Sequence, residues 1–344
     1  MKKNLLMVAV ATSLLMASCS KQNAGSSISP GTGGGGIFDR GGGGSTGSHD
    51  FAGIPLGGLP DNLFVFTDGT RDADLQGASK GFIGDITING VLASERTSGT
   101  VPYAGTITTN ASTLNGWQNI INDNSAQATG VLGNGTLVSD LQTTLENAFS
   151  QINALAVTPG YSGITPQSLD GLNTQNGVAE TFVFDITSGF QVSTQIDITG
   201  DAGDKYIFRW DTDQDPSNGY NGQVKFQSGG AIVPHGGLDA SNFLHVAGDI
   251  ASSGGGSNPA APYPQGPRDA DGTGTLINGG ANWNGGGFFT GYWLTTGAPT
   301  NFSSGQPFGA TSSLSNAIFV GGWYSKTSKF IITSGTSGVH ITMN

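Results

Sequence analysis

Two short stretches set the architecture of this chain: Asn62-Leu63-Phe64-Val65-Phe66 and Gly81-Phe82-Ile83-Gly84-Asp85-Ile86-Thr87-Ile88-Asn89-Gly90. The first is an apolar run between turn residues, and the second alternates apolar and polar residues between glycines. Both patterns are typical of short β-strands, and residues 106–109 continue them. Because one such turn of chain cannot bury its apolar side alone, the pattern predicts stacked coils of a β-solenoid.

The same signature returns in the second half of the chain. Strands are predicted at residues 180–186, 191–198, 205–210, 223–226, 231–233, 243–246, 288–294, 317–324, 329–333 and 339–342. A Gly-, Ser- and Pro-rich stretch at 252–265 is typical of a surface loop. The sequence therefore predicts a mainly β fold in one domain, residues 60–344.

One segment departs from the strand pattern. Leu137, Leu141, Leu145, Phe149 and Ile152 recur at helical spacing and predict an amphipathic helix over residues 138–156. A capping box at residues 139–142 would begin the helix, and the Pro-Gly pair at 159–160 would stop it. We expect this helix to lie along the flank of the solenoid.

The N-terminus resembles a bacterial lipoprotein signal. Lys2 and Lys3 precede an apolar stretch too short to span a bilayer, which ends at Met16-Ala17-Ser18-Cys19. The resemblance implies cleavage after residue 18 and lipidation of Cys19; the alternative is an ordinary secretory signal with an incidental cysteine. Two or more acyl chains anchor stably. Ser20, rather than Asp, favours delivery to the outer membrane, so the expected location is the cell envelope. Whether the domain faces outward stays open.

Residues 19–59 are predicted to be a lipidated cysteine followed by a flexible tether. Two glycine runs, at 33–36 and 41–44, lie among Ser, Thr and Pro residues. A chain of this composition behaves as a flexible coil.

Composition limits the partners. The formal charge is −11, and removal of residues 1–18 with their two lysines makes it −13. Nucleic acid is therefore excluded as a partner, because phosphate binding needs clustered Lys and Arg. Cys19 is the only cysteine, which excludes disulfides and zinc–thiolate sites within the chain. No cofactor is required by any motif.

The strand motifs resemble the choice-of-anchor A family. Residues 62–68, 72–77 and 84–88 are similar to the opening of that domain, Phe182-Val183-Phe184 to its middle, and residues 230–234, 242–248 and 321–340 to its closing coils. The resemblance implies a right-handed β-helix with a flanking helix, carried by surface proteins and regarded as an adhesive module. The ice-binding β-helix family is a more distant resemblance.

One acidic turn is a candidate metal site. Asp211, Asp213, Asp215 and Asn218 offer several hard oxygens in a short span, as Ca²⁺ prefers. The alternative is a plain acidic turn, because Pro216 stands where an EF-hand loop needs glycine and no glutamate follows at the twelfth position. A bound Ca²⁺ would be structural.

Aromatic residues concentrate in the last quarter of the chain. If exposed, they could stack on sugar rings or bind a protein partner; if buried, they fill the core. The candidate ligand-binding residues are Trp283, Tyr292, Trp293, Trp323 and Tyr324.

The favoured function is therefore a lipid-anchored adhesive protein without catalysis, which binds a glycan, a matrix or a surface protein. Two alternatives stay open. Paired carboxylates at Asp72 and Asp74, or at Asp269 and Asp271, could serve a carbohydrate-active enzyme. Thr106, Thr108, Thr109, Asn110 and Thr113 could form part of a flat ice-binding face.

Overall fold

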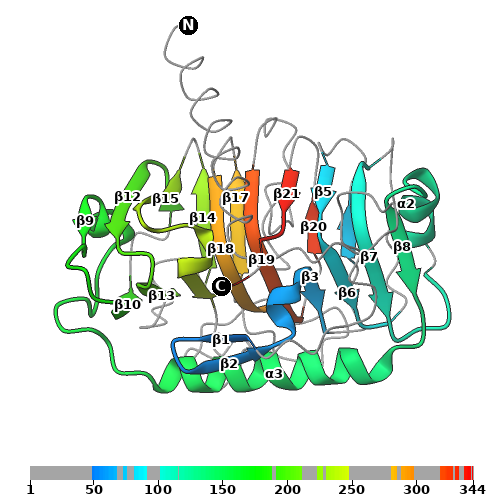
Figure 1. Cartoon of the computed structure of the whole chain (residues 1–344), viewed down its shortest axis with the longest axis horizontal. Helices are drawn as coiled ribbons and strands as arrows, with labels where there is room; N and C mark the ends of the chain where they lie inside the picture. Colours follow the sequence, from blue (N-terminus) through cyan, green and yellow to red (C-terminus); the bar gives the residue numbers. More distant parts are fainter. Residues whose placement is uncertain are drawn as a thin grey trace, which may run out of the picture. The chain divides into compact units, whose positions relative to one another are not determined.

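The described strands pair in parallel, except in the β1–β2 hairpin, which is antiparallel (Figure 1). The computed structural model describes residues 49–67, 73–75, 81–90, 101–114, 116–187, 191–210, 223–227, 230–247, 280–284, 288–297, 318–327, 330–332, 337–341 and 343. The predicted mainly β class is confirmed, and the described residues include two α-helices, α2 (Trp117–Asp123) and α3 (Gly135–Ala154).

One ladder of strands lies beneath α3, and we call it the helix ladder. Its spatial order is β10 (Thr181–Ile186), β13 (Lys205–Trp210), β16 (Phe243–Ala247), β18 (Phe288–Gly297), β19 (Ile318–Thr327), β3 (Asn62–Phe66), β6 (Asp85–Ile88), β7 (Tyr103–Thr109) and β8 (Ala128–Val131). The predicted strands in these regions are confirmed, with shifts of a few residues at their ends.

A second ladder, which we call the open face, shares three of these strands. It consists of β9 (Leu172–Asn173), β12 (Gln195–Gly200), β15 (Ala231–Gly236), the first residues of β18 and β19, β21 (Ser337–Val339), β5 (Gly81–Ile83) and the first residues of β7. The shared strands turn a corner: Phe288 pairs with Ala231 of β15, whereas Tyr292 pairs with Leu244 of β16.

Shorter ladders complete the set of strands. They are β11 (Gln191–Val192), β14 (Gln223–Gln227) and β17 (Gly280–Asn284) in one sheet, and β4 (Ala73–Leu75) with β20 (Phe330–Ile332) in another. Short 3₁₀ turns lie at η1 (Leu59–Asp61), η2 (Pro166–Leu169) and η4 (Ala240–Asn242).

The two halves of the chain join at β19. Trp323, Tyr324 and Ser325 of β19 pair with Phe64, Val65 and Phe66 of β3, and β21 pairs with β5 on the open face. The first coils of the sequence therefore stack on the last ones, a long-range contact that no local pattern reveals.

A row of large side chains fills the interior of the helix ladder. The pairing places Phe184, Phe208, His245, Trp293, Trp323, Phe64 and Ile86 in register on successive strands. All are buried, and the ring centroids of Phe208 and Trp293 lie 4.5 and 4.0 Å from that of His245. Stacking in register lets each coil cover the apolar side of the next.

Helix α3 covers the outer side of the same ladder. Leu141, Leu145, Ala148, Phe149 and Ile152 pack against outward residues of the ladder, as the predicted helical spacing requires. Figure 1 shows α3 running along the ladder from its β8 end to its β10 end. Twenty residues give a helix of about 30 Å, comparable with about 38 Å for nine strands.

The ends of α3 differ from the prediction. The helix begins at Gly135, and the side chain of Asn134 accepts a hydrogen bond from the Leu137 N–H, so the predicted capping box at residues 139–142 is wrong. At the other end Leu155 is already extended. The buried Arg209 donates from Nη1 to the carbonyls of residues 152, 153 and 155, satisfying the last turn.

The folded region begins before the predicted boundary at residue 60. Strands β1 (His49–Phe51) and β2 (Ile54–Gly57) form a hairpin within the range predicted as tether. Phe51, Ile54, Leu56 and Leu59 are buried and pack in the same cluster as α3. The prediction followed the glycine content of residues 19–59. Burial of these four apolar residues instead makes residues 49–59 part of the folded domain.

Gly321 allows β19 to turn between the two ladders. Its φ is +143°, and an added Cβ would lie 1.9 Å from the carbonyl oxygen of Gly291 on the neighbouring strand. We predict that Gly321→Ala lowers the free energy of unfolding by at least about 3 kcal/mol, since both strain and overpacking result. The control is Gly135→Ala, where the nearest atom lies 3.9 Å away and the effect should stay below about 1 kcal/mol in urea unfolding. Equal effects would contradict this account.

Arg209 links α3 to the ladder through a buried ion pair. Its Nε lies 2.6 Å from Asp185 Oδ1, so Arg209→Met should cost about 3–5 kcal/mol by leaving that carboxylate unpaired. The double variant Asp185→Leu with Arg209→Met should cost less than Arg209→Met alone, because no buried charge is then uncompensated. Urea unfolding of Arg209→Met, of Asp185→Leu and of the double variant measures this. A double variant at least as destabilised as the sum of the single ones would contradict the pairing.

Candidate functional site

Several predicted site residues lie outside the described residues. These are the lipidation site Cys19 and the candidate calcium ligands Asp211, Asp213, Asp215 and Asn218. Lipidation and calcium binding therefore remain predictions. In the described part of the chain, no group of three or more His, Cys, Asp or Glu side chains could hold a metal ion.

Four of the five candidate ligand-binding aromatics belong to the core. Tyr292, Trp293, Trp323 and Tyr324 are at most 1% exposed, so they cannot stack on an external ligand. Adjacent residues are buried because both sides of these strands are covered: the tryptophans face inward, and the tyrosines face α3. Trp283 lies in β17 opposite Phe226, and its side chain is outside the described set.

The open face is the ladder that α3 does not cover. The outward residues of β10, β13, β16 and β3 pack with α3, whereas Phe82, Phe319 and Ile232, the buried residues of the open face, point to the interior. Because side chains alternate along a strand, the neighbours of Phe82 and Phe319 point outward.

On β19, β5 and β7 the outward residues are uncharged and have exposed surface: Val320, Ile83 and Ala104. The pairing places Thr290, Val320, Val339, Ile83 and Ala104 in register on five successive strands. Ile83 is 57% exposed and Val320 is partly exposed, whereas Thr290 is buried and donates to the Ile232 carbonyl. In-register strands lie about 4.8 Å apart, so the row is regularly spaced.

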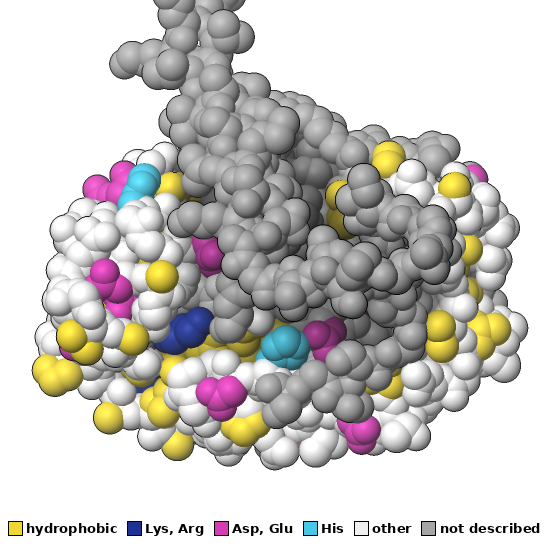
Figure 2. Space-filling model, viewed as in Figure 1, with side chains coloured by type: hydrophobic (Ala, Val, Ile, Leu, Met, Phe, Trp, Pro, Cys, Tyr) yellow, Lys and Arg dark blue, Asp and Glu magenta, His cyan; other side chains and the backbone are white. Residues whose placement is uncertain are grey.

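A polar pair lies at the β12–β15 end of the open face. His235 Nε2 lies 2.7 Å from Asp197 Oδ1, and both side chains are exposed to solvent. Partial burial acts against ionisation, but hydrogen bonds from His235 and Gln195 outweigh it and lower the pKa of Asp197. Figure 2 shows a histidine beside acidic side chains in the region of β12 and β15, while most of the described surface in this view is uncharged.

The sequence analysis did not single out the outward row. Its residues are ordinary strand residues, and only their register across coils brings them together. The alternation of Phe82 and Ile83 indicated one outward position, but nothing in the local sequence indicates that β5 pairs with β21. The described part of this ladder thus carries exposed aliphatic residues near its middle and the polar pair of Asp197 and His235 near one end.

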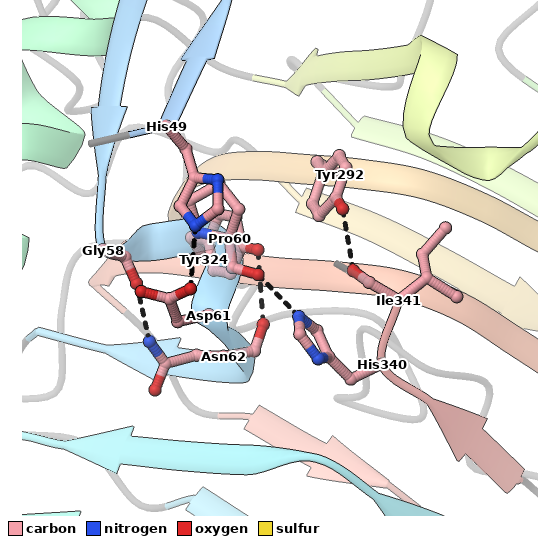
Figure 3. A network of polar contacts seen from close by, with 9 residues as sticks. All are labelled: His49, Gly58, Pro60, Asp61, Asn62, Tyr292, Tyr324, His340 and Ile341. Carbon is pink, nitrogen blue, oxygen red and sulfur yellow. Dashed lines mark hydrogen bonds and ion pairs between the residues drawn. The ribbon is translucent and has the colours of Figure 1, made fainter. Parts of the chain in front are cut away.

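A second polar cluster holds the ends of the folded chain together (Figure 3). His49 Nε2 lies 2.8 Å from Asp61 Oδ1, and His340 Nε2 donates to the Pro60 carbonyl. Tyr324 and Tyr292 donate to the carbonyls of Asn62 and Ile341. Since these groups bond to one another and to backbone, the cluster has a structural role.

The buried His245 and the partly buried His340 should make stability depend on pH. Burial lowers the pKa of His245 and of His340 below the usual 6.5, so the folded state keeps them neutral while the unfolded state binds protons as the pH falls. We predict that the free energy of unfolding decreases below about pH 6.5, by up to about 1.4 kcal/mol per pH unit for each histidine. Urea unfolding at several pH values between 5 and 8 measures this slope. His245→Phe should reduce it, and an unchanged slope would contradict the assignment.

Comparisons with known proteins give structural similarity only. No family model matches the chain, and no curated protein matches it. The chain is similar to an ice-binding protein from the Antarctic ascomycete Antarctomyces psychrotrophicus, with a TM-score of 0.45, 12% identity, and coverage of 85% of this chain and 98% of that one. An ice-binding protein from an Antarctic biological consortium matches with a TM-score of 0.44 and 13% identity, over 87% of this chain and 98% of that one. A glycosylated ice-binding protein from Arctic yeast matches with a TM-score of 0.45 and 12% identity, over 85% of this chain and 96% of that one. Among the described residues, no helix is long and apolar enough to cross a membrane.

Proposed function

We propose that this chain is an envelope-anchored, non-catalytic binding protein that holds its ligand on the open face of a right-handed β-helix. The observation that supports this most is the in-register pairing of β18, β19, β21, β5 and β7, along which Val320, Ile83 and Ala104 have exposed surface. A flat, regularly spaced surface of this kind fits an extended and repetitive partner, such as an uncharged surface polymer or matrix.

The choice-of-anchor A resemblance and the lipid anchor belong to the same proposal. Lipidated Cys19 would hold the chain in the outer membrane, and residues 20–48 would form the tether before His49. A flexible chain of that length has a root-mean-square reach of about 30 Å. The rigid face could then meet a partner beyond the membrane surface.

The chemistry of the face indicates which glycans it could bind. Its outward row carries no charge among the described residues, whereas Asp197 and His235 lie at one end. Apolar contact with the faces of sugar rings, and hydrogen bonds at the polar end, would suit neutral polysaccharides better than anionic ones.

Ice binding is a second candidate, favoured by a separate observation. Thr106 and Thr129 pair across β7 and β8 with their Oγ1 atoms 3.2 Å apart, and both have exposed surface. The predicted face is smaller than expected, however. Thr109 is buried and donates to the Gly90 carbonyl, and Thr108 is only 8% exposed.

A binding experiment with matched variants tests the main proposal. Purified chain carrying Cys19→Ser should bind insoluble neutral polysaccharides or a glycan array, and Ile83→Lys should weaken binding at least tenfold by placing a charge in the apolar row. Val178→Lys is the control, because Val178 is 60% exposed and lies outside the open face.

Three results would decide between the alternatives. Equal binding by Ile83→Lys and Val178→Lys, or no binding to any glycan, matrix or cell surface, would contradict the proposal. Thermal hysteresis abolished by Thr129→Lys would support ice binding instead. Release of reducing ends from a polysaccharide would support the carbohydrate-active alternative.

A further inference from the structure

The two ends of the helix ladder differ in how their strand edges are covered. At the β10 end, residues 158–164 run along the outer edge of the strand. Thr158 N–H donates to the Val183 carbonyl, Asp185 N–H to the Tyr161 carbonyl and Ile164 N–H to the Asp185 carbonyl. The backbone of the chain itself therefore blocks this end against another strand.

The β8 end lacks such a cover in the described part of the chain. β8 pairs with β7 on one side, and no described segment pairs with its other side. Thr129, Gly130 and Val131 are exposed, with Val131 at 40% and the following Leu132 at 49%. The β8 edge therefore presents free backbone hydrogen-bonding groups beside two exposed aliphatic side chains.

The interior is nevertheless closed at this end. Side chains of Leu114 and Ile121 lie where a Cβ on Gly130 would be, and Trp117 and Ile120 of α2 are buried with them. The exposed feature is thus the strand edge and not the core. A partner would add a strand rather than fill a cavity.

The β8 edge also lacks the features that normally prevent strand pairing. Residues 124–139 contain no charged residue and no proline, and the pairing of β8 with β7 shows no bulge. Exposed edges usually carry Lys, Pro or a bulge for protection. In a chain of net charge −11, a neutral edge is also the place where two copies can approach without like-charge repulsion.

We propose that a second copy of this chain pairs with it through β8. The two β8 strands would run antiparallel about a two-fold axis, so that the helix ladder continues from one copy into the other and Val131 of each copy lies opposite Ala128 of the other. Because residues 158–164 cover the other end, growth stops at the dimer. This inference rests on the fold and does not depend on the proposed function.

Sedimentation velocity on the full chain carrying Cys19→Ser tests the pairing over roughly a hundredfold concentration range. The chain should change from monomer to dimer as concentration rises. Val131→Lys should weaken or abolish the dimer, since each copy would then place a charged side chain in the paired edge, which is otherwise uncharged. Val178→Lys, at an aliphatic position that is more exposed than Val131 and lies away from β8, should dimerise like the parent chain.

A second measurement uses the parent chain alone, so it does not depend on whether a substituted chain folds. Amide hydrogen exchange at residues 128–132 of the parent chain should slow as concentration rises, while exchange at residues 176–179 should not change. A parent chain that stays monomeric at every concentration would overturn the proposal, and so would dimers equally formed by Val131→Lys. Unchanged exchange at residues 128–132 in a dimer would place the interface elsewhere and overturn it too.

Discussion

A single strand of this protein can neither satisfy its backbone hydrogen bonds nor bury its inward side chains. Both require a neighbouring strand that pairs with it in register. The row from Phe184 to Ile86 shows the constraint most clearly, because aromatic and aliphatic side chains of successive strands stack directly on one another. A shift of one residue would turn this row outward and expose it to water. The parallel pairing, the corners at glycines and the regular spacing of the open face all depend on that register.

Helix α3 relies on the same register on the other side of the strands. Its buried residues meet outward side chains from strands of both halves of the chain, including Val65 of β3 and Val183 of β10. Arg209 then fixes the C-terminal end of the helix to β10 through Asp185. The helix thus packs on the outward residues of β10, β13, β16, β18, β19 and β3, and no residue of the open face belongs to this cluster.

The sequence predicted what is set locally. Apolar runs bounded by turn residues gave most strands, and the spacing from Leu137 to Ile152 gave the long helix. What it could not give is long-range: the pairing of β19 with β3, and hence the order of the coils, involves residues about 260 positions apart. The aromatics were ambiguous because alternation predicts one exposed side, whereas β18 and β19 are covered on both sides. The hairpin at residues 49–57 was missed because glycine-rich neighbours hid four buried apolar residues.

The central claim is that the first coils of the sequence stack on the last ones in register. Ile83 of β5 and Val339 of β21 are paired residues of the two halves, at a Cα separation of about 5 Å that suits a disulfide. In a chain carrying Cys19→Ser, the changes Ile83→Cys and Val339→Cys should give a spontaneous intramolecular disulfide, seen as faster migration in a non-reducing gel. The pair Ile83→Cys and Val178→Cys should not, because Val178 precedes β10 at the far end of the ladder. Equal cross-linking of the two pairs, or none in either, would contradict the stacked arrangement.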